Sequence, residues 1–225
     1  MADFDFSRPM VFTAMLQFPA LAQPKQVKGS NTSKYSAQLI LKKDDPKTQA
    51  VIDEIKARIL HEAEAAFGTD AKVILKRQKD ANKFVVFKDG DEIWKRAKAD
   101  LDEDPDSEIT QKAEKNASYN KGTFFLTASS SSKFRPEYAN FDCTPITDPA
   151  DIEELFYPGV TVRAVIKIAA YSVDVNRGVT CYLQGLQIVK HTPRLDTSGG
   201  SAAQFFEPVA IESVSNDTEV MEDLL

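Results

Sequence analysis

The sequence has few of the residues that build metal centres and disulfides: two cysteines and two histidines among 225 residues. Cys143 and Cys181 are isolated, without a CxxC pair, whereas a structural zinc site needs about four Cys or His ligands. We therefore expect no metal. Cys181 lies in a strand-like apolar run, which indicates a buried free thiol rather than a disulfide.

Long apolar runs are missing as well. No stretch approaches the roughly 20 apolar residues of a transmembrane helix. The acidic N-terminus, residues 1–5, lacks the basic and apolar regions of a signal peptide. We expect a soluble, cytosolic protein without a membrane partner. The 42% hydrophobic content is ordinary for a globular chain.

Signature motifs of enzymes are absent: the sequence has no GxGxxG, GxxxxGK[ST], HExxH or GxSxG pattern. His61 and His191 have the settings of solvent-facing residues rather than of catalytic bases. Carboxylates cluster at 100–108, but the glycine and closing glutamate of an EF-hand are missing. We expect no catalytic activity and no cofactor.

Positive charge is missing from the end of the chain, since no Lys or Arg follows Arg194. The acidic residues beyond it are Asp196, Glu207, Glu212, Asp217, Glu219, Glu222 and Asp223. Removing these seven from the 34 acidic residues leaves residues 1–194 with 27 acidic and 28 basic side chains. We therefore expect a folded domain over 1–194 and an acidic, largely disordered tail over 195–225.

A second acidic segment lies at 99–115, with seven carboxylates against two lysines. Its polar, weakly patterned sequence predicts an exposed insertion. Residues 1–194 carry a net charge of +1, and the segment at 99–115 carries −5. The remainder of residues 1–194 therefore carries +6. The total of −6 thus conceals a mildly basic body, which is compatible with binding nucleic acid.

Periodicity predicts a mainly β, α+β domain with an antiparallel, barrel-like sheet and one long and one short helix. Strands are expected at 11–18, 34–42, 73–75, 84–87, 121–128, 160–171 and 179–189. The long helix should cover 46–67, after Asp45 and before Gly68. The short helix should run from Asp148 to Phe156, and Gly185 marks a bulge in the last strand.

The strand at 160–171 carries the best candidate for a binding face. Arg163, Lys167 and Tyr171 recur every four residues and share one side of the strand. If the last strand pairs with it, Tyr182 joins them. Cations that track the backbone and aromatic rings on which bases stack are what sequence-tolerant binding of single strands requires. An ordinary hydrated sheet face is the alternative.

Three further pairs combine a cation with an aromatic ring elsewhere in the sequence. They are Lys34 with Tyr35, Lys121 with Phe125, and Arg135 with Phe134. Phe125, flanked by two threonines, is expected to face outward, whereas its neighbour Phe124 should enter the core. Each pair alone is weak evidence, since cations are common on solvated surfaces.

Two motifs in the C-terminal half carry a family resemblance: ELFYPGVTVRA at 154–164 and GVTCYLQGLQIVK at 178–190. They resemble the phage single-stranded DNA-binding proteins that have an OB fold and an acidic C-terminus. Residues 34–37 and 94–95 are similar as well, so the resemblance covers nearly the whole chain. It implies DNA contacts among Tyr157, Arg163, Tyr182 and Lys190, the residues within the matching motifs.

The resemblance also implies a function for the tail. In that family the acidic tail competes with DNA for the groove and contacts replication proteins, such as a polymerase or helicase, in the infected host cell. The residues that would do so here are Asp217, Glu219, Glu222 and Asp223. The chain ends in Leu224–Leu225 instead of the aromatic residue of the more familiar tails.

The interpretation is a non-catalytic protein that binds and protects single-stranded DNA during phage replication, recombination or repair. One alternative is an acidic scaffold that engages basic partners and has no affinity for nucleic acid. Another is a nucleic-acid enzyme that uses the carboxylates at 100–108 with Mg²⁺.

Overall fold

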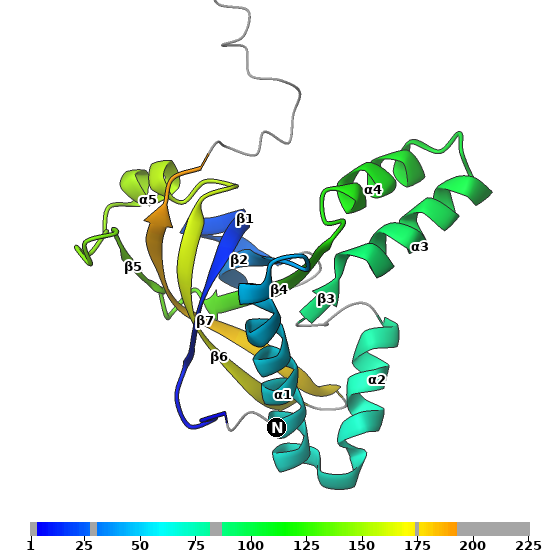
Figure 1. Cartoon of the computed structure of the whole chain (residues 1–225), viewed down its shortest axis with the longest axis horizontal. Helices are drawn as coiled ribbons and strands as arrows, with labels where there is room; N and C mark the ends of the chain where they lie inside the picture. Colours follow the sequence, from blue (N-terminus) through cyan, green and yellow to red (C-terminus); the bar gives the residue numbers. More distant parts are fainter. Residues whose placement is uncertain (1–3, 28–30, 82–86, 174–175, 193–225) are drawn as a thin grey trace, which may run out of the picture. The chain divides into compact units, whose positions relative to one another are not determined.

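The computed structural model describes residues 4–27, 31–81, 87–173 and 176–192 (Figure 1). The strands are β1 (Met10–Gln26), β2 (Ser33–Lys42), β3 (Phe87–Asp89), β4 (Thr123–Ser131), β5 (Glu137–Ala139), β6 (Thr161–Val173) and β7 (Asn176–Lys190). The helices are α1 (Pro46–Phe67), α2 (Ala71–Ala81), α3 (Gly90–Glu103), α4 (Glu108–Ser118) and α5 (Pro149–Leu155), with a 3₁₀ turn at Gly68–Asp70. Among the described residues, no helix is long and apolar enough to cross a membrane.

The strands form one sheet in the order β3–β4–β2–β1–β6–β7–β5. A further parallel pairing, between Ser129 of β4 and Tyr182 of β7, closes β1, β2, β4, β7 and β6 into a barrel. Strand β1 pairs with two strands: with β6 through Met10–Met15, and with β2 from Met15 onward. A five-stranded closed barrel of this kind is an OB-like fold, so the predicted fold class is confirmed.

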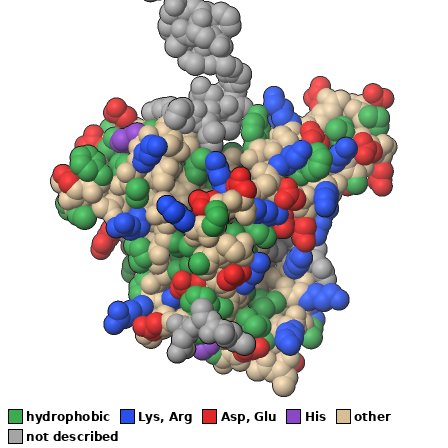
Figure 2. All heavy atoms as spheres, viewed as in Figure 1, with side chains coloured by type: hydrophobic (Ala, Val, Ile, Leu, Met, Phe, Trp, Pro, Cys, Tyr) green, Lys and Arg blue, Asp and Glu red, His purple; other side chains and the backbone are tan. Residues whose placement is uncertain are grey.

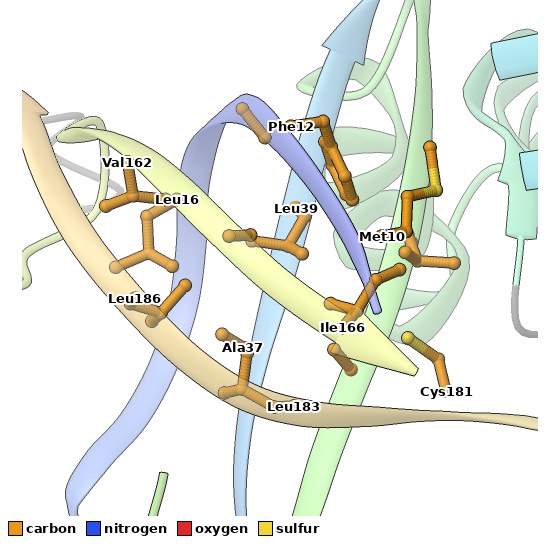
Figure 3. Close-up of a cluster of buried hydrophobic side chains, with 14 of the residues drawn as sticks. Met10, Phe12, Leu16, Ala37, Leu39, Val162, Ile166, Cys181, Leu183 and Leu186 are labelled. Atoms are coloured by element: carbon orange, nitrogen blue, oxygen red, sulfur yellow. The ribbon is translucent and has the colours of Figure 1, made fainter. Parts of the chain in front are cut away.

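Strict alternation along the strands builds the core. On β6, Val162, Ala164 and Ile166 are fully buried, whereas Arg163 and Lys167, which point to the other side, are exposed. Side chains of β1, β2, β6 and β7 meet inside the barrel, among them Leu16, Leu39 and Leu186 (Figure 3). Burying each large aliphatic side chain contributes about 1.5–3 kcal/mol, so the apolar face of each strand fixes its register.

The long helix begins and ends where its sequence signals indicate. The Asp45 side chain accepts a hydrogen bond from the Lys47 amide at 2.9 Å, Pro46 follows, and Gly68 ends the helix with a φ of 54°. Ile52 and Ile55 are fully buried, and α1 packs on β2, β6 and β7. The predicted helix at 46–67 is therefore confirmed.

The strand pair near the C-terminus and the short helix also agree with the predictions from the sequence. Helix α5 is capped by Asp148, which accepts from the Ala150 amide at 2.7 Å. The β6–β7 ladder is irregular where Val165 pairs with Gly185 and Ile166 pairs with Leu183, which confirms the bulge beside this glycine. Cys181 is buried and free, as predicted, and burial raises the pKa of its thiol.

The segment between β2 and β4 differs from the prediction. Residues 73–75, expected as a strand, lie in α2, because a three-residue apolar run fits a helix as well as a strand. The segment at 99–115, expected as an exposed insertion, is mostly exposed, but it belongs to a helical hairpin of α3 and α4 that was not predicted, joined by a hydrogen bond from Trp94 Nε1 to Glu114 Oε1 at 2.7 Å. Of the expected strand at 84–87, residues 84–86 lie outside the described part of the chain, and Phe87 begins β3.

Candidate nucleic-acid interface

The outer surface of the β6–β7 ladder brings together three of the predicted site residues. Lys167 lies opposite Tyr182 in the register, and Arg163 lies opposite Gln187. The Arg163 guanidinium donates to Gln187 Oε1 at 3.5 Å, and Tyr182 is 46% exposed. The strands therefore hold two cations and one accessible aromatic ring on one side of the barrel.

This surface continues across the seam where the barrel closes. Tyr182 pairs with Ser129 of β4, and Ser129 pairs with Ser36 of β2. Two residues further along the same strands, Ser131 pairs with Lys34, which is exposed. Small hydroxyl side chains thus separate the Lys167–Tyr182 pair from the Lys34 cation and leave the strand surface between them open.

The loop after β4 adds an aromatic ring and a cation beside Lys34. The Phe134 amide donates to the Ser131 carbonyl at 3.0 Å, while the Ser130 hydroxyl donates to the Phe134 carbonyl. These bonds fix a loop in which the Phe134 side chain is 72% exposed. The Arg135 guanidinium carbon lies 5.8 Å from the centre of the Tyr138 ring.

We call this surface the basic face. It comprises Lys34, Phe134, Arg135, Arg163, Lys167 and Tyr182.

A groove of about 450 Å³ adjoins the basic face between β5, the segment at 143–147 and the β6–β7 ladder. Arg135, Val165 and Gln187 are among its lining residues. The Gln187 side chain donates to the carbonyls of Asn140 and Phe141, both at 3.3 Å, and so connects residues 140–141 to β7. Phe141 beside this groove is 69% exposed, and it was not predicted as a site residue because it lies outside any alternating run.

Two predicted site residues are buried, and those assignments are corrected. Tyr35 is 9% exposed because it shares the inward face of β2 with Ala37 and Leu39. Phe125 is 4% exposed, although it does lie on the opposite side of β4 from the core residue Leu126. Its cross-strand neighbours on this side of the sheet are Ile40 of β2, itself 4% exposed, and Lys88 of β3. Side chains directly opposite in paired strands contact one another, so facing away from the barrel does not expose Phe125.

Four other predicted residues lie apart from the basic face. Lys121 Nζ sits 3.8 Å from the centre of the Trp94 ring, beside α3. The Tyr157 hydroxyl donates to the Thr192 carbonyl at 2.7 Å, which holds the end of β7. Tyr171 is half-buried and accepts from Gln78 Nε2 at 3.4 Å, and Lys190 is exposed at the end of β7.

The four acidic tail residues of the prediction, Asp217, Glu219, Glu222 and Asp223, lie outside the described residues. The predicted boundary at residue 194 lies outside them too. Within the described ranges, no three His, Cys, Asp or Glu side chains gather as a metal site would require.

A closed OB-like barrel with cations and exposed rings on its outer surface defines the class of oligonucleotide-binding barrels. Within that class, the chain belongs to the family of the Enterobacter phage Enc34 single-stranded DNA-binding protein, whose family model matches residues 10–219.

Solved structures share the fold at low sequence identity. The Enc34 protein in complex with single-stranded DNA has a TM-score of 0.60 and 19% identity, covering 84% of this chain and 90% of that one. The Enc34 protein in a second structure has a TM-score of 0.60 and 18% identity, covering 89% and 91%. Gp2.5 of bacteriophage T7, a single-stranded DNA-binding protein, has a TM-score of 0.46 and 15% identity, covering 85% and 98%. No curated protein matches the chain.

Proposed function

We propose that this protein binds and protects single-stranded DNA, largely without sequence specificity, during phage DNA replication, recombination or repair. The observation that carries the proposal is the Lys167–Tyr182 pair at the barrel seam, which places a cation directly beside an accessible ring. Membership of the Enc34 family supports it, since the Enc34 protein has been solved with single-stranded DNA. Binding of this kind involves no catalytic step.

The basic face supplies the two interactions that such binding needs. Arg163, Lys167 and Lys34 attract the phosphate backbone, and binding releases counterions from the DNA. Tyr182 and Phe134 offer rings to successive bases, each stacked base contributing about 1–3 kcal/mol. Every base has an aromatic surface, so stacking tolerates any sequence. The hydroxyl side chains between these groups add polar contacts without selecting a base.

We further propose that residues 195–225 form a separate acidic tail that modulates this binding. Its seven carboxylates and lack of cations make it an electrostatic mimic of the phosphate backbone. When the tail occupies the basic face, DNA must displace it; when DNA is bound, the released tail is free to recruit replication proteins in the cytoplasm of the infected cell.

The test is a titration of labelled oligo-dT with three proteins: the full chain, the 1–194 truncation, and a full-length variant with the four tail residues Asp217, Glu219, Glu222 and Asp223 changed to Asn or Gln. Binding by the full chain should weaken with salt. Both altered proteins should bind more tightly than the full chain, most clearly at low salt, where screening is weak.

The full-length variant keeps the length of the tail but loses four of its charges. It therefore distinguishes an effect of tail charge on DNA affinity from an effect of tail length. Equal affinity of all three proteins would reduce the tail to a solubility or partner-binding extension. Absence of oligonucleotide binding at low salt, by the full chain and the truncation alike, would refute the binding function and favour the acidic-scaffold alternative.

A further inference from the structure

A cleft separate from the basic face lies between α1, α2, β3 and the beginning of α3. It has a volume of about 330 Å³ and is lined by Lys56, Lys79, Phe87, Lys88, Asp89, Glu92, Ile93, Arg96 and Phe124. Figure 2 shows several Lys and Arg side chains over α2 and the neighbouring part of α3. We call this cavity the helical cleft.

The two carboxylates of the helical cleft are already neutralised. Asp89 contacts Lys43 Nζ at 2.6 Å and also accepts from the amides of Asp91 and Glu92 as the cap of α3. Glu92 is paired with Lys79 at 3.2 Å.

Three cations of the cleft have no such partner. Lys56, Lys88 and Arg96 form no ion pair with any other described residue. Burial lowers the pKa of Lys88, which is the expected effect on a cation that loses water without gaining a counter-ion. The helical cleft therefore has an excess of positive charge that an anion would relieve.

Two stacked aromatic rings line the helical cleft. The rings of Phe87 and Phe124 are stacked with centroids 5.0 Å apart and an interplanar angle of 14°. Lys43 and Lys56 lie over the Phe124 ring, with their Nζ atoms 4.5 and 5.0 Å from its centroid. The Phe124 ring thus places the Lys56 ammonium beside the cleft, where it can meet an anion.

The helical cleft extends toward the part of the β6–β7 ladder that lies beyond the basic face. An adjoining cavity of about 190 Å³ shares Lys56, Lys79 and Phe87 with it and extends to Gln78 and Val179. Gln78 bonds to the backbone of Val179 at 3.0 and 3.3 Å and to the Tyr171 hydroxyl at 3.4 Å. Tyr171 lies on β6 on the same side as Lys167, one step of four residues further along the strand.

We propose that single-stranded DNA leaving the basic face past Tyr171 enters the helical cleft, where Lys56, Lys88 and Arg96 bind its phosphates. This inference rests on the proposed function and extends it. The helices inserted between β2 and β4 then serve as the second half of the DNA-binding track, and a long strand gains contacts that a short one does not reach.

The test compares a short and a long oligo-dT, of about 8 and 30 nucleotides, because a single OB barrel covers roughly 4–16 nucleotides. The variant is the full chain with K56Q and R96Q, two exposed side chains. Binding of the short oligonucleotide should stay within about twofold of the unmodified protein. Binding of the long one should weaken at least tenfold, and its log–log salt slope should fall by about 1.4, or 0.7 for each lost phosphate contact.

Two controls make the result specific. The K112Q/K115Q variant removes two cations from α4, away from the helical cleft, and should leave both affinities unchanged. The charge-conserving K56R/R96K variant should retain binding of the long oligonucleotide.

If the unmodified protein binds neither oligonucleotide, the proposed function itself fails. If it binds both, and K56Q/R96Q weakens neither of them or weakens both equally, the cleft is not part of the track. Equal melting temperatures of the variants exclude unfolding as the cause.

Discussion

Lys167 lies directly opposite Tyr182 in the β6–β7 ladder, and Tyr182 is also the residue through which β7 pairs with β4. The seam that closes the barrel therefore carries a cation and an accessible ring at adjacent positions. Exposing a large ring on a closed barrel contributes nothing to its core, so a stacking ligand is a physical reason for having one there.

Replacing Tyr182 by Ala should weaken binding of oligo-dT by about 1–3 kcal/mol, or roughly 5- to 150-fold, since one stacked base is lost. Fluorescence anisotropy at low salt measures the change. Tyr119 is the matched control, because it is 47% exposed against 46% for Tyr182 and lies at the end of α4. Tyr182→Phe should retain most of the affinity. A loss of the same size in Tyr119→Ala would show that the seam has no special part in binding.

Replacing Arg163 by Gln should reduce the salt dependence of binding. The side chain is exposed, and among the described residues its hydrogen-bond partner is the neutral Gln187, so its charge is available to a phosphate. The slope of log affinity against log salt should fall by about 0.7, which is one phosphate contact on a single strand. Lys112→Gln on α4 should leave the slope unchanged. An Arg163→Gln protein with weaker binding but an unaltered slope would assign the residue to packing instead.

The alternation of apolar and polar residues was sufficient to predict the strands of the barrel. The inward and outward residues of β6 follow from period two, and the caps Asp45 and Asp148 mark the starts of α1 and α5. These signals are local, because each depends on side chains within a few residues. The β6–β7 part of the basic face was predictable for the same reason.

The remaining features depend on contacts between distant segments. Phe125 is on the side of β4 that alternation assigns, but its neighbours on that side come from distant strands: Ile40 of β2 and Lys88 of β3, which lie 85 and 37 positions earlier in the sequence. The α3–α4 hairpin is polar, and its helices are joined by a bond between Trp94 and Glu114, which hydrophobic periodicity does not detect. The helical cleft forms only where α1, α2 and β3 come together in the fold, so no local sequence pattern predicts it.

Gly90 should tolerate no side chain. A Cβ atom at this position would lie 1.8 Å from the Asn120 carbonyl oxygen, and a backbone atom cannot move aside as a side chain can. Gly90→Ala should therefore destabilise the protein by at least about 2–3 kcal/mol, by separating α3 from the start of β4. Urea unfolding measures the change in the free energy of unfolding.

Gly178 provides the matched comparison, since its Cβ would lie 2.2 Å from Gln78 Nε2, the end of a flexible side chain. Gly178→Ala should cost about 1 kcal/mol, because Gln78 can rotate away at the loss of its hydrogen bonds to Val179. Equal destabilisation by the two substitutions would contradict the close approach of Gly90 to Asn120.

The contact between Asp91 and Lys43 should make stability depend on pH. A hydrogen bond from the Gly122 amide, at 2.8 Å, and the ammonium of Lys43, at 2.6 Å, hold the pKa of Asp91 below its ordinary value. A carboxylate whose pKa is depressed by folding stabilises the protein above its unfolded pKa of about 3.9, and that stabilisation is lost as the pH falls through the lower, folded value. Asp91→Asn can still accept from Gly122 but loses the ion pair. It should lower the free energy of unfolding at pH 7 by about 1 kcal/mol or less, since the pair is partly exposed to solvent. Below pH 4 the difference from the unmodified protein should shrink, as protonation removes the same interaction.

Asp44→Asn is the control, because its exposed carboxylate makes no ion pair or side-chain hydrogen bond with another described residue. Urea unfolding between pH 2.5 and 7, in steps of about half a unit around the carboxylate range, follows both variants. A difference between Asp91→Asn and the unmodified protein that stays constant across this range would mean that the Asp91 charge does not stabilise the junction of α3 with β4.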